Sequence, residues 1–402
     1  MFLKKKKTEE TADADVSKRR LPELPNTFRI GFLKFNVNGL DLWFAGIVLA
    51  LLAFGLVMMF SASYAYAFYH EGNSFYYITR QLIFALLGVI VMFLVSLVDY
   101  HFWHKLAIPV YAAALVLLVL ALLSPAQSGV HRWITVAGVS VQPSEIAKFA
   151  IILIFADFAV RFRKEIQIYT FRYGILPYIA MLLPIVGLLV AEPHLSGTVL
   201  CCGIALIMMF VGGTSMKWFI GGGIAVGIGL IGVLASGVIR YAQSRLEVWF
   251  DPWSDALGKG WQTIQSLYAI GSGGILGVGL GNSRQKQLYI SEPQNDFVFA
   301  VVCEELGYIG AIAVILLFAL LVWRGFVIGL RAHDTFGMLL AIGITSQIGL
   351  QAALNIAVVT NTIPNTGISL PFFSYGGSSL MMLLFEMAIV LSVSRQSRVE
   401  KT

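Results

Sequence analysis

Two opposite charges lie at the beginning of an apolar segment of the chain. Glu145 and Lys148 follow Gln142-Pro143-Ser144, a sequence that is typical of a helix start. Residues three apart share one face of a helix, and charged side chains within membrane segments are rare and usually functional. The pair is therefore either a cation oriented by an acid or a salt bridge between helices, and the spacing leaves both interpretations open.

A single acid ends the longest polar segment. Asp296 directly precedes the apolar run 297–301, so it is predicted to begin a helix, where aspartate is a favourable N-cap. A carboxylate here can also serve as a general base for a hydroxyl group. The helix N-terminus lowers its pKa and desolvation raises it, and the sequence does not decide which effect is larger.

Arg132 and Trp133 lie side by side in a shorter polar segment. Tryptophan is common at membrane interfaces, while the guanidinium group is a donor suited to an anionic phosphate.

The glycine-rich segment 271–281 lacks the Gly-Lys-Ser/Thr ending and the βαβ context of nucleotide-binding loops. Its glycines predict tight turns beside the membrane. The alternative is a phosphate cradle of backbone N–H groups helped by Arg284 and Lys286.

Several polar groups lie within or next to apolar segments. Glu192-Pro193-His194 closes one segment, and a satisfied interfacial histidine explains His194 better than a metal ligand. Gln347, Gln351 and Asn355 recur every four residues, which predicts contact between helices. Glu386 is expected to be buried and needs a partner that the sequence does not identify.

Composition defines the class of protein. Of 402 residues, 58% are hydrophobic and 12% charged, with mean hydropathy +0.80, far from a soluble domain. Continuously apolar runs favour helices over a β-barrel. We therefore predict an all-α polytopic membrane protein with about ten transmembrane helices, near 41–62, 79–98, 106–123, 144–161, 174–191, 198–213, 218–238, 298–324, 338–361 and 378–394.

The distribution of lysine and arginine predicts the orientation. Most of the 28 basic residues lie on one side of the predicted spans, which makes this side, with both termini, cytoplasmic. The net charge of +6 thus reflects membrane insertion and contact with lipids, not nucleic acid. The expected units are a disordered basic tail (1–40), a membrane domain (41–394) and a cytoplasmic C-terminal tail (395–402). Between spans seven and eight, the extracytoplasmic loop 240–297 is expected to contain short interfacial helices.

Together these motifs resemble the SEDS proteins, the FtsW, RodA and SpoVE group of bacterial shape, division and sporulation proteins. The resemblance covers almost the whole membrane region. It is carried by Arg132-Trp133, Gln142-Pro143-Ser144-Glu145 with Lys148, Asp251-Pro252, the glycine-rich 271–286, Asp296-Phe297, Glu304-Glu305-Leu306-Gly307 and 370–379.

The resemblance implies a ten-span fold and a peptidoglycan glycosyltransferase in the bacterial cytoplasmic membrane. Its substrate would be lipid II, polymerised at the outer face, and its partner a class B penicillin-binding protein that supplies transpeptidation. The family's essential loop aspartate falls on Asp296, and its functional Arg-Trp and Glu/Lys positions fall on Arg132, Trp133, Glu145 and Lys148. One site differs from the family pattern, since Glu192-Pro193-His194 has histidine where the family often has aspartate.

The resulting hypothesis assigns a role to each residue. Asp296 deprotonates the acceptor hydroxyl, while Arg132 and Lys148, or a bound divalent cation such as Mg²⁺ or Mn²⁺, stabilise the departing pyrophosphate. Glu145 orients Lys148 or holds that ion, although the sequence defines no metal site and no other cofactor. Further contacts to substrate are expected from Trp133, Arg284, Lys286, Ser374 and Tyr375.

Two rival functions remain open. A lipid II flippase would move the head group without chemistry, and Glu386 with the polar stripe 347–355 is the feature that favours it. A non-catalytic scaffold would only recruit the penicillin-binding protein, and Asp296 argues against it.

Overall fold

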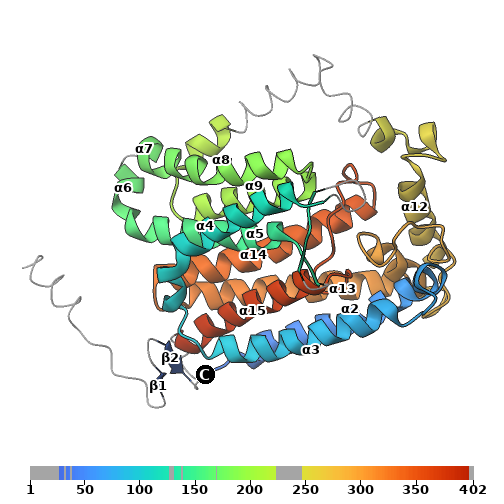
Figure 1. Ribbon diagram of the computed structural model, residues 1–402, viewed down its shortest axis with the longest axis horizontal. Coiled ribbons are helices and arrows are strands. Elements are labelled where there is room, and N and C mark those ends of the chain that lie inside the picture. The colour runs from blue at the N-terminus through green and yellow to red at the C-terminus, as the bar shows by residue number, and fades with distance from the viewer. Residues whose placement is uncertain are drawn as a thin grey trace, which may run out of the picture.

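The computed structural model describes residues 27–30, 33–36, 39–125, 131–136, 139–168, 170–222 and 247–397. Helices dominate this part of the chain (Figure 1). Seven of them are long and apolar enough to cross a membrane, and α9 is a shorter apolar helix. The chain is thus a multi-pass helical membrane protein.

The described residues form two pairs of short strands and a series of helices. The strands form two short hairpins, β1 (Thr27–Ile30) with β2 (Leu33–Asn36) and β3 (Ile134–Val136) with β4 (Val139–Val141). The helices are α2 (Leu42–Glu71), α3 (Tyr76–Ser96), α4 (His101–Leu123), α5 (Pro143–Arg161), α6 (Arg163–Ile168), α7 (Thr170–Gly174), α8 (Leu176–Ala191), α9 (Leu195–Val211), the 3₁₀ helix η1 (Pro252–Asp255), α12 (Trp261–Gly273), α13 (Val298–Leu330), α14 (Thr335–Val359) and α15 (Gly377–Gln396).

The predicted spans coincide with helices wherever the structure describes them. The predicted span 218–238 lies largely outside the described residues. α5 lies where a span is predicted, but it is not among the seven, because Glu145, Lys148, Asp157 and Arg161 make it less apolar. In the long loop, η1 and α12 are the short helices that its aromatic residues indicate.

Two expectations need correction. The prediction of a disordered tail over 1–40 is wrong for Thr27–Ile30 and Leu33–Asn36, which pair as an antiparallel hairpin. The all-α class holds for the spanning segments only, since β3 and β4 form a second hairpin directly before α5. Short hairpins satisfy their own backbone groups, so they are compatible with the ends of a helical bundle.

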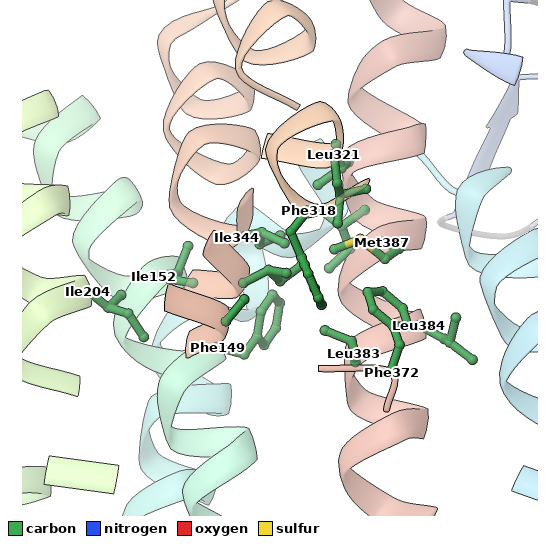
Figure 2. Packing of buried hydrophobic residues seen from close by; sticks show 14 of the residues in the cluster. Phe149, Ile152, Ile204, Phe318, Leu321, Ile344, Phe372, Leu383, Leu384 and Met387 are labelled. Atoms are coloured by element: carbon green, nitrogen blue, oxygen red, sulfur yellow. The ribbon is translucent and has the colours of Figure 1, made fainter. Parts of the chain in front are cut away.

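The core lies between α5, α13, α14 and α15. In the most apolar windows of α14 and α15, 67% of residues are buried, against 22% for α3 and α4, so α3 and α4 leave most of their surface to lipid. Figure 2 shows Phe318 of α13 between Ile344 of α14 and Met387 of α15, with Phe149 of α5 nearby. These interlocking side chains fix the helices whose outer ends carry the polar residues.

The glycine-rich segment packs against a break in α13. Gly307 has φ 64° inside this helix, and a Cβ there would collide with the backbone of Gly277. Backbone hydrogen bonds join the two segments, from Val278 N to Glu304 O (2.9 Å) and from Tyr308 N to Gly274 O (2.9 Å). The glycines therefore permit tight turns and a close approach of two backbones, which is the interpretation favoured from the sequence.

An ion pair ties α2 to α13 at the end of the bundle that carries β1 and β2 (Figure 1). Asp41 caps α2 and pairs with Arg324 of α13 at 2.8 Å, and Gly39 lies against Arg395 of α15. α12 lies at the opposite end of the bundle from β1 and β2 (Figure 1). The two ends are therefore chemically distinct, and the cavity described next lies at the α12 end.

Candidate active site

A cavity of about 740 Å³ opens where the N-terminal ends of α3, α5 and α15 meet the segment that precedes α13. Six of the predicted site residues line it: Arg132, Trp133, Glu145, Asp296, Ser374 and Tyr375. They are up to 243 positions apart in the chain. The fold thus brings the predicted site together, although the roles of the residues stay predictions.

Asp296 presents its carboxylate to the cavity. Asn355 of α14 donates to its carbonyl oxygen at 2.8 Å, which holds the backbone here. The predicted N-cap role is wrong, because Phe297 occupies that position of α13. Among the described residues, the Asp296 carboxylate accepts no hydrogen bond, and Gly367, with φ 72°, lies close to its Oδ2 atom.

The surroundings of Asp296 decide the direction of its pKa shift, which the sequence left open. Burial raises its pKa to about 6; Glu292 adds to this shift, and Arg132 counteracts it. Desolvation is therefore the largest cause of the shift. A carboxyl group with this pKa is largely ionised at neutral pH and is still basic enough to take a proton from a hydroxyl group in a transition state.

Glu145 and Lys148 form an ion pair on α5, in which Lys148 is buried and Glu145 partly buried. Lys148 Nζ lies 2.9 Å from Glu145 Oε1 and donates to Gln351 Oε1 of α14 at 2.8 Å. Lys148 lines a small adjoining cavity of about 40 Å³, whose wall includes Glu145, Gln351 and Ser369. Its ammonium group is thus oriented by an acid and an amide, and it lies directly behind the wall of the large cavity.

Arg132 is held at the rim by the segment between α8 and α9. Its guanidinium donates to the Pro193 carbonyl oxygen. Burial raises the pKa of the neighbouring Glu192 to about 7, against the attraction of Arg132. His194 is buried, and its pKa is lowered to about 3 by burial, Arg132 and Lys148. Its ring therefore stays neutral, and it lines the cavity beside Arg132.

Ser374 and Tyr375 connect the segment before α15 to the segment before α13. Ser374 Oγ donates to the Asn295 carbonyl oxygen at 2.5 Å, and Tyr375 N donates to the Gln294 carbonyl oxygen at 2.8 Å. These bonds hold the backbone on the N-terminal side of Asp296. The Ser374 hydroxyl group is thus already engaged within the protein.

Arg80 of α3 is a cavity residue that the sequence analysis missed. Its guanidinium lies 4.1 Å from the centre of the Tyr76 ring and interacts with the hydroxyl group of Tyr375. The sequence held a signal, since an arginine four residues after a tyrosine near the start of a predicted span lies on the same helical face as that tyrosine.

The prediction that Arg284 and Lys286 bind substrate is not supported by their positions. Neither residue lines the cavity. Lys286 is buried in an ion pair with Glu305 at 2.6 Å and donates to Ser61 of α2. The backbone N–H of Arg284 donates to Glu304 Oε1 at 2.8 Å. The donors predicted as a phosphate cradle therefore bind carboxylates of α13.

The polar stripe on α14 holds the site together, as its spacing predicts. Gln347 donates to Glu386 at 2.8 Å, which supplies the partner that the sequence left unidentified. Gln351 accepts from Lys148 and donates to the Ser369 carbonyl oxygen. The described residues contain no group of three or more His, Cys, Asp or Glu side chains that could hold a metal ion.

The sequence matches the cell cycle protein family of FtsW, RodA and SpoVE over residues 42–399. Stage V sporulation protein E of Bacillus subtilis is 42% identical over 361 residues, which cover 89% of this chain and 98% of the relative. A protein of Trichlorobacter lovleyi named "Probable peptidoglycan glycosyltransferase FtsW" is 38% identical, over 90% of this chain and 94% of its own.

Solved structures agree with the sequence matches. A chain from a peptidoglycan synthase complex that coordinates polymerization and crosslinking superposes with a TM-score of 0.74 and 28% identity, over 89% of this chain and 98% of that one. The rod shape determining protein RodA of Thermus thermophilus superposes with a TM-score of 0.64 and 25% identity, over 90% of this chain and 98% of that one.

Fold and site define a membrane-embedded enzyme whose cavity lies at one end of a helical bundle. The chain belongs to the FtsW, RodA and SpoVE family. The names of its relatives confirm the predicted enzyme class, a glycosyltransferase.

Proposed function

We propose that this protein polymerises lipid II into glycan strands, with Asp296 as the general base. The supporting observation is the arrangement around Asp296. Its carboxylate has a raised pKa and accepts no protein hydrogen bond among the described residues, and it shares one cavity with Arg132. An acid held in this way beside a cation suits the attack of a hydroxyl group on a carbon that bears a pyrophosphate.

The proposed step balances without any further reactant. The 4-hydroxyl group of the acceptor sugar gives its proton to Asp296, and its oxygen forms a bond to the anomeric carbon of the donor. The bond from that carbon to the pyrophosphate oxygen breaks, and undecaprenyl pyrophosphate leaves with the electron pair. Arg132 and Lys148 stabilise its negative charge, Glu145 orients Lys148, and the proton on Asp296 passes to water.

A divalent cation stays part of the proposal as an alternative source of positive charge. Glu145, Glu292 and Asp296 are the carboxylates on the cavity wall, and oxygen ligands of this kind suit Mg²⁺ or Mn²⁺. Because Glu145 already pairs with Lys148, such an ion would have to share this carboxylate.

The membrane arrangement belongs to the same proposal. We place ten spans in the cytoplasmic membrane, with both termini inside and the cavity outside, where lipid II is available for polymerisation. A class B penicillin-binding protein is the proposed partner. The similarity to a chain of a synthase complex that couples polymerization and crosslinking supports such a partner.

The test is glycan formation from labelled lipid II by the purified protein with its penicillin-binding partner. The partner should carry only transpeptidase activity, so that polymer has one source. Asp296→Asn should lower the rate by about 100- to 10,000-fold, the usual contribution of a general base. A wild-type rate in Asp296→Asn would refute the base assignment. If the wild-type protein gave no polymer, lipid II translocation in vesicles would test the flippase.

A folding control accompanies this variant. The pKa of Asp296 in the folded protein, about 6, exceeds its ordinary value of 3.8, so at pH 7 the ionised carboxylate destabilises the fold. Asparagine removes this charge. Asp296→Asn should therefore unfold at a temperature no lower than that of the wild type, and its inactivity would then be chemical.

A further inference from the structure

A second arginine, Arg80, lines the cavity besides Arg132. Arg80 lines the cavity from α3, a helix that packs closely against α15. Tyr76 lies under its guanidinium, and Tyr375 contacts it from the segment before α15. The Tyr375 ring in turn packs edge-on against Tyr77, with ring centroids 4.8 Å apart. Aromatic rings from two elements therefore fix the direction of Arg80.

The two arginines have different neighbours within the protein. Arg132 is close enough to Asp296 to lower its pKa. Arg80 lies over the Tyr76 ring of its own helix and interacts with Tyr375. A guanidinium that is anchored by aromatic rings and faces a polar cavity is suited to bind phosphate with two parallel hydrogen bonds.

The two substrates of the proposed reaction each carry a pyrophosphate group. One belongs to the donor and leaves from the reacting carbon, so its cations must lie near Asp296. The other belongs to the acceptor and is retained, and a disaccharide separates it from the hydroxyl group that Asp296 deprotonates. A site for the second pyrophosphate therefore has to lie in the same cavity, away from the base.

We propose that Arg80, held by Tyr76 and Tyr375, binds the retained pyrophosphate of the acceptor lipid, while Arg132 faces the pyrophosphate that leaves. This inference rests on the proposed glycosyl transfer. It adds a second anion site on the α3–α15 wall and assigns the two ends of the cavity to two lipid-linked substrates.

Binding stoichiometry tests this site without turnover. The full chain with Asp296→Asn is placed in nanodiscs of zwitterionic lipid and titrated with labelled lipid II. Two molecules should bind per protein. Adding Arg80→Ala to this variant should weaken the affinity for one of the two lipid II molecules by roughly 10- to 100-fold, the usual effect of losing hydrogen bonds to a charged group. Arg80→Lys should recover part of the lost affinity. Because Arg80 is exposed, the unfolding temperature should not change.

Arg284→Ala is the matched control, since it removes an exposed arginine outside the cavity and should leave both sites unchanged. A separate series adds phosphatidylglycerol, which would displace the second lipid II if the site took any phospholipid head group. Fewer than two bound lipids with Arg80 present, two tight sites without it, displacement by phosphatidylglycerol or an equal loss in Arg284→Ala would each overturn the proposal. The proposed base assignment fails separately, if Asp296→Asn still makes polymer.

Discussion

At the scale of single residues, the pH dependence of polymerisation should follow the ionisation of Asp296. The base form is the carboxylate, and its pKa is about 6, so activity should fall about tenfold per pH unit below 6 and level off above 7. Glu292→Gln should move the midpoint to lower pH, because Glu292 is one of the charges that raise this pKa. Initial rates of glycan formation between pH 5 and 8.5 measure both effects.

Glu192, with its pKa near 7, can add a second step to this profile. The shift in Glu292→Gln therefore identifies Asp296. Glu165→Gln, an equal charge change on α6, should leave the midpoint in place. A midpoint that stays unchanged in Glu292→Gln would contradict the assignment.

Single residues differed in how far the sequence could predict them. Asp296, Glu145, Lys148 and Arg132 could be singled out because charges beside apolar segments are rare. Lys286 satisfied the same criterion, yet it pairs with Glu305. Periodicity and spacing do not reveal which of two buried charges finds an internal partner from a distant helix, since such pairing depends on tertiary packing.

At the scale of elements, the glycine-rich segment is fastened to α2 and α13 by the buried pair of Lys286 and Glu305, which are 3% and 0% exposed. Lys286→Met leaves the Glu305 carboxylate buried without its cation, which typically costs about 3–5 kcal/mol. The variant should therefore unfold at a markedly lower temperature in detergent. Arg284→Met, which changes an exposed side chain two residues away, should stay close to the wild type.

A second substitution separates lost charge from lost packing. Combining Lys286→Met with Glu305→Gln removes both charges and should recover much of the stability. Equal unfolding temperatures for Lys286→Met and Arg284→Met would show that the pair does not fasten this segment.

Hydropathy predicted the helices well, because the length of an apolar run sets the length of a span. It could not predict the break at Gly307, where α13 leaves helical geometry so that the backbone at 274–279 can pair with it. That break depends on a contact between segments about thirty residues apart, and the local composition of the run does not encode it. The β1–β2 hairpin was missed for a different reason, since the charged residues around it indicated a disordered tail.

At the scale of the whole molecule, the two ends of the bundle have different tasks. Asp41 and Arg324 pair between α2 and α13, and Asp157 and Arg161 pair within α5, at one end, while the opposite end holds the cavity. This polarity agrees with the distribution of lysine and arginine, which predicts that the cavity end faces outward. In the proposed orientation, a substrate with a membrane-bound tail and a polar head would reach Asp296 from the outer leaflet.

Labelling of single cysteines tests this orientation. In a chain whose Cys201, Cys202 and Cys303 are replaced by alanine, Leu257→Cys places a thiol at a position that is 90% exposed at the α12 end. Lys164→Cys places one on α6. A membrane-impermeant maleimide should label Leu257→Cys in intact spheroplasts and Lys164→Cys only after permeabilisation.

Labelling of both thiols in detergent provides the control for reactivity. The opposite pattern in spheroplasts would place the cavity in the cytoplasm. Polymer would then have to be made on the inner face, and neither the outward active site nor a transpeptidase partner acting outside could stand. Because the helices and their ion pairs would be unchanged by such an inversion, only a measurement with a sided reagent distinguishes the two orientations.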